Sequence, residues 1–272
     1  MKILSHFKAL AGKSQKGINI ISAIKNADVI VINVPYNDFY SLLFMESIIN
    51  LENFYNGIGK KTIVLMCKRL SIFRPYFDGY VKFYHEDNKN KMKEFYNYIG
   101  NIDRNSIYVD FTPITDNIDD SILKKIKSVV RISIGAERSG FNIYIKYQSD
   151  IMETIHTLES ILCVKNKNIK GIINKKKKQG KGICIESNIY SIYTGEKIKT
   201  PCIMPDFYSL DNKNQIIEKI NDCEYVICYK NAYAAIGNLL NKKVICISED
   251  RYLPYGIYKC KKESVEIDYY IE

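Results

Sequence analysis

Residues 28–43 read DVIVINVPYNDFYSLL, and this stretch decides the fold. Residues 28–34 are apolar almost throughout, as a strand that is buried on both faces should be. Pro35 ends this strand, and the turn that follows places Asp38 where it can cap a helix over residues 39–55. A buried strand that runs through a turn into a helix opens a βαβ unit, so we expect a parallel sheet.

The same alternation continues through the first half of the chain. Further apolar runs predict strands at residues 61–67, 79–84, 105–111 and 129–134, and amphipathic segments predict helices at 89–99 and 119–128. For residues 1–27 two interpretations stay open, an irregular extension or a helix around residues 17–26. A connector helix over 150–162 follows, with apolar residues at helical spacing.

The second half repeats this logic with shorter segments. We expect strands at residues 182–186, 201–205, 225–229 and 243–248, helices at 214–221 and 232–240, and an edge strand in the alternating tail 264–271. The predicted fold class is therefore α/β, with two Rossmann-like domains whose mainly parallel sheets face each other across a cleft. The domains are expected at residues 1–147 and 148–272, with the linker helix and a lysine-rich loop at 148–181.

Composition limits the compartment and the partners. No apolar run is long enough for a signal-peptide core or a membrane span, so we expect a soluble, cytoplasmic protein. The eight cysteines form no C-x-x-C pair and the three histidines are scattered, so neither a metal nor a cofactor is expected. Cys184, Cys228 and Cys246 lie in strand-like runs and are interpreted as small buried apolar residues.

The net charge of +10 favours anionic partners, although a lysine-rich soluble surface explains it equally well. Eight lysines and no acid lie between Glu159 and Glu186, including the run 175–178. This run either contacts an anionic membrane surface at the inner membrane face, binds nucleic acid, or is a solvated loop. Because no aromatic residues are interleaved with the lysines, the solvated loop is favoured and nucleic acid is not the expected partner.

Three segments carry a resemblance to a known family: residues 31–43, residues 130–140 with the helix 152–162, and residues 216–248. Together they resemble the heptosyltransferase-like glycosyltransferases, glycosyltransferase family nine. In that family a Gly-Asp pair ends the first strand, and Asn37-Asp38 matches it. Asn tolerates the left-handed backbone that Gly allows, so the exchange is mild. Residues 216–248 resemble the donor-site segment, and Pro254-Tyr255-Gly256 resembles the family's ending.

The resemblance implies a glycosyltransferase B architecture, with the first domain on the acceptor side and the second on the donor side. It also implies inverting, metal-independent transfer from a nucleotide-sugar donor to a glycan or glycolipid acceptor, as in lipopolysaccharide biosynthesis. One departure bears on this. Where the family has Asp-Ser-Gly and a following His, this sequence has Lys230, Asn231, Ala232 and Ala235.

Glycosyl transfer needs a base near the acceptor hydroxyl and donors for the leaving diphosphate. Asp38, at a strand end, is the candidate base, and its alternative role is a plain helix cap. The amides of residues 229–233, which include Ala232 and Tyr233, can hold an anion at a helix N-terminus. Lys230 adds charge there or is a solvated lysine, and Asn231 is more simply the cap of this helix.

Three further residues are candidates for substrate or donor binding, and Asn37, which pairs with Asp38 in the match to the family, is the first. Arg138 lies in the turn 135–140 and can form a bidentate hydrogen bond to a phosphate or carboxylate, or can form an interdomain salt bridge. Glu249 follows the strand 243–248 and can accept a hydrogen bond from a ribose.

Three functions therefore compete. The leading one is a glycosyltransferase of surface-glycan assembly. The second is a catalytically inactive or repurposed protein of the same fold that binds a small anion or a protein partner, which the lost Asp-Ser-Gly and His favour. The third, nucleic-acid binding, rests on net charge alone.

Overall fold

The structure of this 272-residue chain is a computed structural model. The part that it describes is residues 19–113, 117–135, 137–147, 151–164, 180–207, 213–248, 253–254, 256–260 and 264–271. The chain forms two compact units. The first comprises residues 1–36 and 47–169, and the second comprises residues 37–46 and 170–272.

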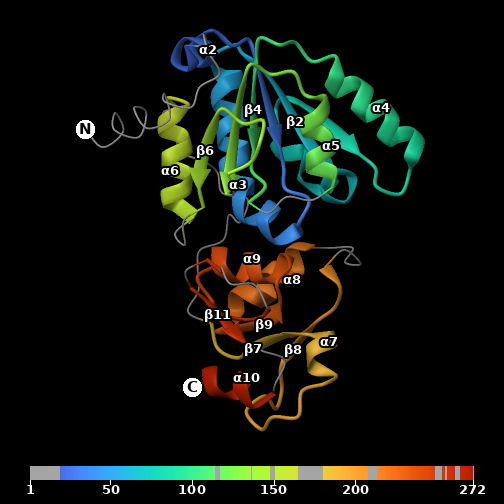
Figure 1. The fold of residues 1–272 in the computed structure, drawn as a ribbon. Helices are drawn as coiled ribbons and strands as arrows, with labels where there is room; N and C mark the ends of the chain where they lie inside the picture. Colours follow the sequence, from blue (N-terminus) through green and yellow to red (C-terminus); the bar gives the residue numbers. More distant parts are fainter. Residues whose placement is uncertain are drawn as a thin grey trace. The chain divides into compact units, whose positions relative to one another are not determined.

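The first unit contains a six-stranded parallel sheet in the order β3-β2-β1-β4-β5-β6 (Figure 1). Its strands are β1 (Val29–Asn33), β2 (Lys61–Cys67), β3 (Tyr80–Tyr84), β4 (Ser106–Asp110), β5 (Val130–Gly135) and β6 (Ile143–Lys146). The central strand β1 is flanked by β2 and β4, and its residues Ile30, Val31 and Ile32 are fully buried. Burial on both faces explains why β1 is apolar up to its last residue, the polar Asn33.

The helices of the first unit cover both faces of this sheet. They are α2 (Ile20–Asn26), α3 (Asp38–Gly57), the 3-10 helix η1 (Lys68–Tyr76), α4 (Lys89–Gly100), α5 (Asn117–Lys125) and α6 (Ile151–Ile161). Helices α4 and α5 pack together on one face of the sheet, and α3 lies on the other (Figure 1). Right-handed crossovers that leave a central strand in both directions produce this arrangement.

The second unit contains a five-stranded parallel sheet in the order β11-β10-β9-β7-β8. Its strands are β7 (Ile183–Glu186), β8 (Cys202–Met204), β9 (Tyr225–Tyr229), β10 (Lys243–Ile247) and β11 (Ile257–Cys260), and its helices are α7 (Ser187–Tyr190), α8 (Lys213–Asp222), α9 (Ala232–Leu239) and α10 (Ser264–Tyr270). Helix α3 is divided between the units: residues 38–46 group with this second unit, and residues 47–57 belong to the first.

The core of the second unit follows the alternation of its strands. Ile185, Ile227 and Ile245 face one way and pack with Ile267 of α10. On the other face Val226 and Val244 lie next to Gly237 of α9, where an added Cβ would come within 2.8 Å of Val244. Cys184, Cys228 and Cys246 are fully buried, which confirms that they serve as small apolar residues.

The predicted fold class is confirmed: both units are α/β with parallel sheets. The boundary between the two compact units falls between residues 169 and 170. Helix α6, which was expected to open the second domain, therefore belongs to the first unit. The prediction of an edge strand over residues 264–271 is wrong, because α10 occupies most of it. Ile267 and Ile271 are both buried, and their spacing of four residues suits one face of a helix.

Candidate functional site

Each sheet has a point where its strand order reverses, and ligands of open α/β sheets bind beyond the carboxyl ends of the strands there. In the first unit the reversal lies between β1 and β4, and in the second between β7 and β9. The residues that end these four strands are Asn33, Asp110, Glu186 and Tyr229.

At the reversal of the first unit, a buried polar cluster joins three elements. Asn33 and Asp110 are register partners at the ends of β1 and β4. The Asn33 side-chain amide donates to Asp110 Oδ1 at 3.1 Å and to Asp119 Oδ1 of α5 at 3.0 Å. All three side chains are fully buried. Carboxylates removed from water need such partners, so the cluster depends on a compensating cation.

Arg138 supplies that cation. Its Nη2 donates to Asp110 Oδ2 at 2.5 Å, its Nε donates to Ser133 at 3.4 Å, and its guanidinium lies 4.7 Å from the ring centre of Phe141. The expected interdomain salt bridge is wrong, because Asp110 belongs to the same unit as Arg138. The side chain is only 9% exposed, so a ligand would reach it by entering the cluster.

A second polar group of the first unit contains a cysteine, Cys67, at the end of β2. Its thiol donates to Glu86 at 2.6 Å, and Tyr36 donates to the same carboxylate. Burial, together with the hydrogen bond to Glu86, raises the pKa of Cys67 to about 12. Because the thiolate is the reactive form, Cys67 is a structural thiol and a poor nucleophile.

At the start of α3, Asn37 rather than Asp38 caps the helix. The Asn37 Oδ1 accepts hydrogen bonds from the backbone amides of Phe39 at 3.0 Å and Tyr40 at 3.4 Å. The expectation that Asp38 is the cap is therefore wrong, and Asp38 is the first residue of the helix itself. Its side chain is half-buried. Its role as a base stays a prediction, and the capping role is no longer an alternative to it.

The ammonium of Lys230 is held by the aromatic side chains at the start of α3. Lys230 Nζ donates to the Tyr40 hydroxyl at 2.6 Å and lies 4.4 Å from the Tyr40 ring centre and 5.3 Å from that of Phe39. These residues all belong to the second unit. Lys230 is therefore not a solvated lysine in a surface turn. Its ammonium is half-buried and lies over the rings of Phe39 and Tyr40.

The turn from β9 into α9 is closed by internal hydrogen bonds. Asn231 caps α9, and its Oδ1 accepts from the Tyr233 amide at 3.0 Å. The amide of Tyr229 donates to Glu186 at 3.0 Å, and that of Asn231 donates to the Tyr229 carbonyl at 2.8 Å. The expected anion site made by the amides of residues 229–233 is therefore largely taken up by the chain's own acceptors.

The side chains of Ala232 and Tyr233 belong to the core. Both are about 1% exposed, and the Tyr233 hydroxyl donates to the Pro205 carbonyl. Burial raises the pKa of Tyr233, with a smaller contribution from the charge of Glu186. Two predicted features, Glu249 and the lysine run 175–178, lie outside the described residues.

Glu186 was missed by sequence reasoning, although it ends β7 at the reversal of the second sheet. Its Oε2 accepts hydrogen bonds from the Tyr229 amide and from the Asn231 side chain at 2.9 Å. The signal that could have found it is the one that selected Asp38, a carboxylate directly after an apolar strand. The strand that ends at Glu186 was itself predicted, but its last residue was not considered as a site residue.

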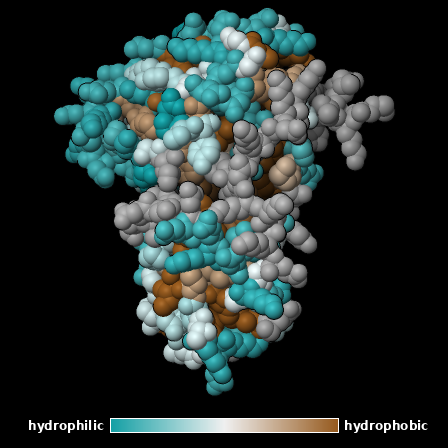
Figure 2. Space-filling view, turned by 180° about the vertical axis from the view of Figure 1, so that it is seen from behind, coloured by the Kyte–Doolittle hydropathy of each residue, from teal (hydrophilic) through white to brown (hydrophobic). Residues whose placement is uncertain are grey.

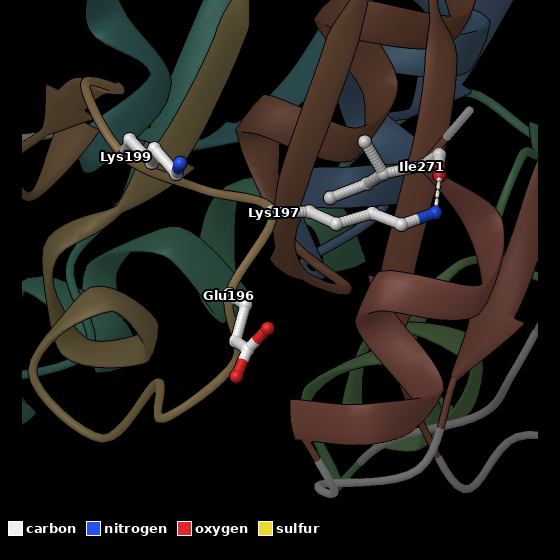
Figure 3. Close-up of a pocket in the computed structure, with 4 residues that line it drawn as sticks. All are labelled: Glu196, Lys197, Lys199 and Ile271. Atoms are coloured by element: carbon white, nitrogen blue, oxygen red, sulfur yellow. Dashed lines mark hydrogen bonds between the residues drawn. The ribbon is translucent and has the colours of Figure 1, made fainter.

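Two surface features lie away from these strand ends. A hollow of about 700 Å³ is lined by Glu196, Lys197, Lys199 and Ile271, and Lys197 donates to the Ile271 carbonyl (Figure 3). Residues 196–199 precede β8, so the hollow lies at the amino end of that strand. Figure 2 shows apolar surface exposed on the second unit, and the exposed large apolar residues among its described positions are Ile192, Ile203, Tyr258 and Tyr269.

None of the described helices is both long and apolar enough to cross a membrane. Among the same residues, no group of three or more His, Cys, Asp or Glu side chains is arranged to hold a metal ion.

No family model and no curated protein sequence matches the chain. Solved structures do match it. A glycosyl transferase of family 9 from Veillonella parvula is similar with a TM-score of 0.54 at 10% identity, over 87% of each chain. The E. coli heptosyltransferase WaaC with ADP is similar with a TM-score of 0.53 at 10% identity, over 88% of this chain and 92% of that one.

The chain has the fold of the family 9 glycosyltransferases. WaaC with ADP-2-deoxy-2-fluoro heptose agrees, with a TM-score of 0.52 at 8% identity over 88% of this chain and 95% of that one. The resemblance that the sequence segments predicted is thus confirmed. At this identity the likeness to the family 9 fold concerns architecture, and chemistry must be argued from the site.

Proposed function

We propose that the chain is a glycosyltransferase-like enzyme that transfers a sugar from a nucleotide-sugar donor to a surface-glycan acceptor. The observation that carries this proposal is Asp38 on a family 9 fold. Asp38 opens α3 directly after the central strand β1, and Asn37 performs the capping. Because Asn37 caps α3, the alternative role of Asp38 as a plain cap falls away, and we assign Asp38 the role of general base.

In the proposed mechanism Asp38 accepts the proton of an acceptor hydroxyl. The oxygen of that hydroxyl attacks the anomeric carbon of the donor sugar, the bond to the nucleoside diphosphate breaks, and the configuration inverts. Asp38 lies in the first turn of α3, where the helix dipole is favourable for a negative charge. We propose Lys230, in the same compact unit, as the cation nearest the leaving diphosphate, so that no metal is required.

The proposed partners follow from the fold and the charge. The WaaC structures contain ADP and an ADP-heptose analogue, which supports a nucleotide-sugar donor for this chain. A net charge of +10 suits an anionic glycolipid acceptor and contact with an anionic membrane surface. We therefore propose a cytoplasmic protein that works at the inner membrane face, in a pathway such as lipopolysaccharide biosynthesis.

A second function has an observation of its own. Glu186 and Asn231 occupy backbone amides at the turn into α9, where the sequence predicted a site for the donor's phosphates. This favours a repurposed protein of the family 9 fold that binds a partner without transferring a sugar. Nucleic-acid binding is supported by net charge alone, so we do not propose it.

Direct titration separates these functions. The chain is titrated with ADP, UDP and duplex DNA at two salt concentrations. Saturable binding of a nucleoside diphosphate with weak salt dependence is the result expected of the enzyme. Binding of neither nucleotide nor DNA supports the repurposed protein. Preference for DNA with steep loss of affinity at high salt contradicts both proposals.

A further inference from the structure

Glu186 ends β7 where the second sheet reverses its order. Its backbone pairs with Met204 of β8 on one side, and β9 lies on the other. This is the position at which an open parallel sheet presents ligand-binding groups. The side chain is half-buried, so part of it remains accessible to a ligand.

One oxygen of this carboxylate is fixed in place. Oε2 accepts from the Tyr229 amide at 3.0 Å and from Asn231 Nδ2 at 2.9 Å. Asn231 is itself held, because its Oδ1 accepts from the Tyr233 amide at 3.0 Å. Glu186 is therefore oriented before any ligand arrives, and it uses donors that a phosphate would otherwise take.

The other oxygen has no such partner. Within the described residues, no group donates a hydrogen bond to Glu186 Oε1, and no lysine or arginine forms an ion pair with Glu186. The neighbouring cation Lys230 directs its ammonium to the Tyr40 hydroxyl. No side chain of the described part of the chain therefore neutralises the carboxylate of Glu186 by direct contact.

We propose that Glu186 is a specificity-determining residue that keeps phosphate out of the first turn of α9 and binds a ligand hydroxyl group through Oε1. A carboxylate accepts hydrogen bonds and repels a phosphate, so the turn receives the hydroxyl-bearing part of the ligand. Where the ligand is a nucleotide-sugar, which rests on the proposed function, that part is a ribose or sugar hydroxyl. The diphosphate then lies outside the first turn of α9, toward the Lys230 ammonium, which contacts Tyr40 of α3.

The first experiment tests the exclusion of phosphate with inorganic pyrophosphate as the probe. Wild type, Glu186→Ala, Glu186→Gln and the control Glu196→Gln are titrated by calorimetry. Glu196 is an exposed glutamate of the same unit, away from the strand ends. We expect Glu186→Ala to bind pyrophosphate at least about tenfold more tightly than wild type, because it removes the charge and frees two donors.

Glu186→Gln is expected to gain less, because its amide oxygen can still accept from Tyr229, and Glu196→Gln is expected to match wild type. Thermal denaturation checks that each variant is folded. If Glu186→Ala does not fold, Glu186→Gln decides the matter, since it retains shape and loses charge. Equal pyrophosphate affinity in wild type and in the folded Glu186 variants overturns the proposal.

The second experiment tests hydroxyl binding by comparing ADP with 2′,3′-dideoxy-ADP. We expect wild type to prefer ADP and Glu186→Ala to lose most of that preference. An unchanged preference overturns the hydroxyl role, while ADP binding itself leaves the proposed function standing. If wild type binds no nucleotide, the proposed function fails, and the pyrophosphate comparison still decides whether Glu186 excludes phosphate.

Discussion

Asn33 and Asp110 end neighbouring parallel strands in register, and the Asn33 amide donates to the Asp110 carboxylate at 3.1 Å. This pair lies at the reversal of the first sheet, and Arg138 completes it with an ion pair at 2.5 Å. Asp110 is fully buried, so its charge depends on Arg138 for compensation. The cluster therefore ties together the end of β1, the end of β4 and the turn after β5.

Removing Arg138 should destabilise the first unit strongly. We expect Arg138→Ala to lower the free energy of unfolding by about 3–5 kcal/mol, because a buried carboxylate is left without its cation. Urea denaturation measures this, and Arg104→Ala, which alters an exposed arginine of the same unit, should change little. Adding Asp110→Asn to Arg138→Ala should recover part of the loss. A loss below about 1 kcal/mol for Arg138→Ala would show that the ion pair is not a structural requirement.

The contact between α9 and its sheet predicts a second stability effect. A Cβ at Gly237 would lie 2.8 Å from Val244 and 3.2 Å from Val226. We expect Gly237→Ala to lower the free energy of unfolding by a net amount of about 1–2 kcal/mol, since overpacking exceeds the gain in helix propensity. Gly100→Ala is the control, because nothing lies within 4 Å of a Cβ there. A stabilised Gly237→Ala variant would contradict this close packing.

Glu52 predicts a pH dependence of stability. It is buried and accepts from Asn56 at 2.5 Å and Thr62 at 3.2 Å, and its burial raises its pKa above 4.5. A carboxyl whose pKa is raised on folding stabilises the fold below its unfolded pKa, and this contribution is lost as pH rises through the folded pKa. The free energy of unfolding of Glu52→Gln, measured in urea, should therefore rise relative to that of wild type between pH 4 and pH 7. A difference that does not change with pH contradicts this.

The cysteines should differ in reactivity. Cys163 is exposed, whereas Cys228 is fully buried and its burial raises its pKa. Because alkylation requires the thiolate, iodoacetamide should modify Cys163 well before Cys67 or Cys228 in the native protein. Peptide mapping by mass spectrometry measures the order of modification, and in urea the difference should disappear. Equal rates in the native protein would contradict the burial of these thiols.

Long apolar runs made much of the fold predictable. The strand at Lys61–Cys67 and that at Tyr225–Tyr229 were predicted with their observed bounds, because buried parallel strands are continuously apolar. The short strands β6 and β11 were missed, although β7 and β8 are no longer and were predicted, because the pattern of so short a segment is ambiguous. The tail 264–271 was mistaken for a strand because, over so few residues, apolar residues at helical spacing of four also fit the alternating pattern of a strand.

The candidate site was less predictable because side-chain partners depend on distant residues. The pairing of Lys230 with Tyr40 spans 190 positions, and that of Arg138 with Asp110 spans 28. Nothing local in the sequence indicates either contact. The choice between Asn37 and Asp38 as the cap of α3 depended on a single residue of register, which pattern reading does not resolve.

The division of roles between Asn37 and Asp38 gives a matched pair of variants. Asn37→Ala removes the cap and should lower the free energy of unfolding by about 0.5–2 kcal/mol without changing the turnover of the folded protein. Thermal denaturation and a transfer assay measure the two effects separately. A large loss of turnover in a folded Asn37→Ala variant would mean that the cap also takes part in the reaction.

The most direct test of the central claim is the rate of sugar transfer by Asp38→Asn, measured as nucleoside diphosphate release from a panel of nucleotide-sugars with glycan acceptors. We expect wild type to transfer a sugar from one of these donors. We also expect Asp38→Asn to remain folded, with turnover reduced by roughly 10²–10⁴-fold. Full turnover in folded Asp38→Asn would contradict the role of Asp38 as the base.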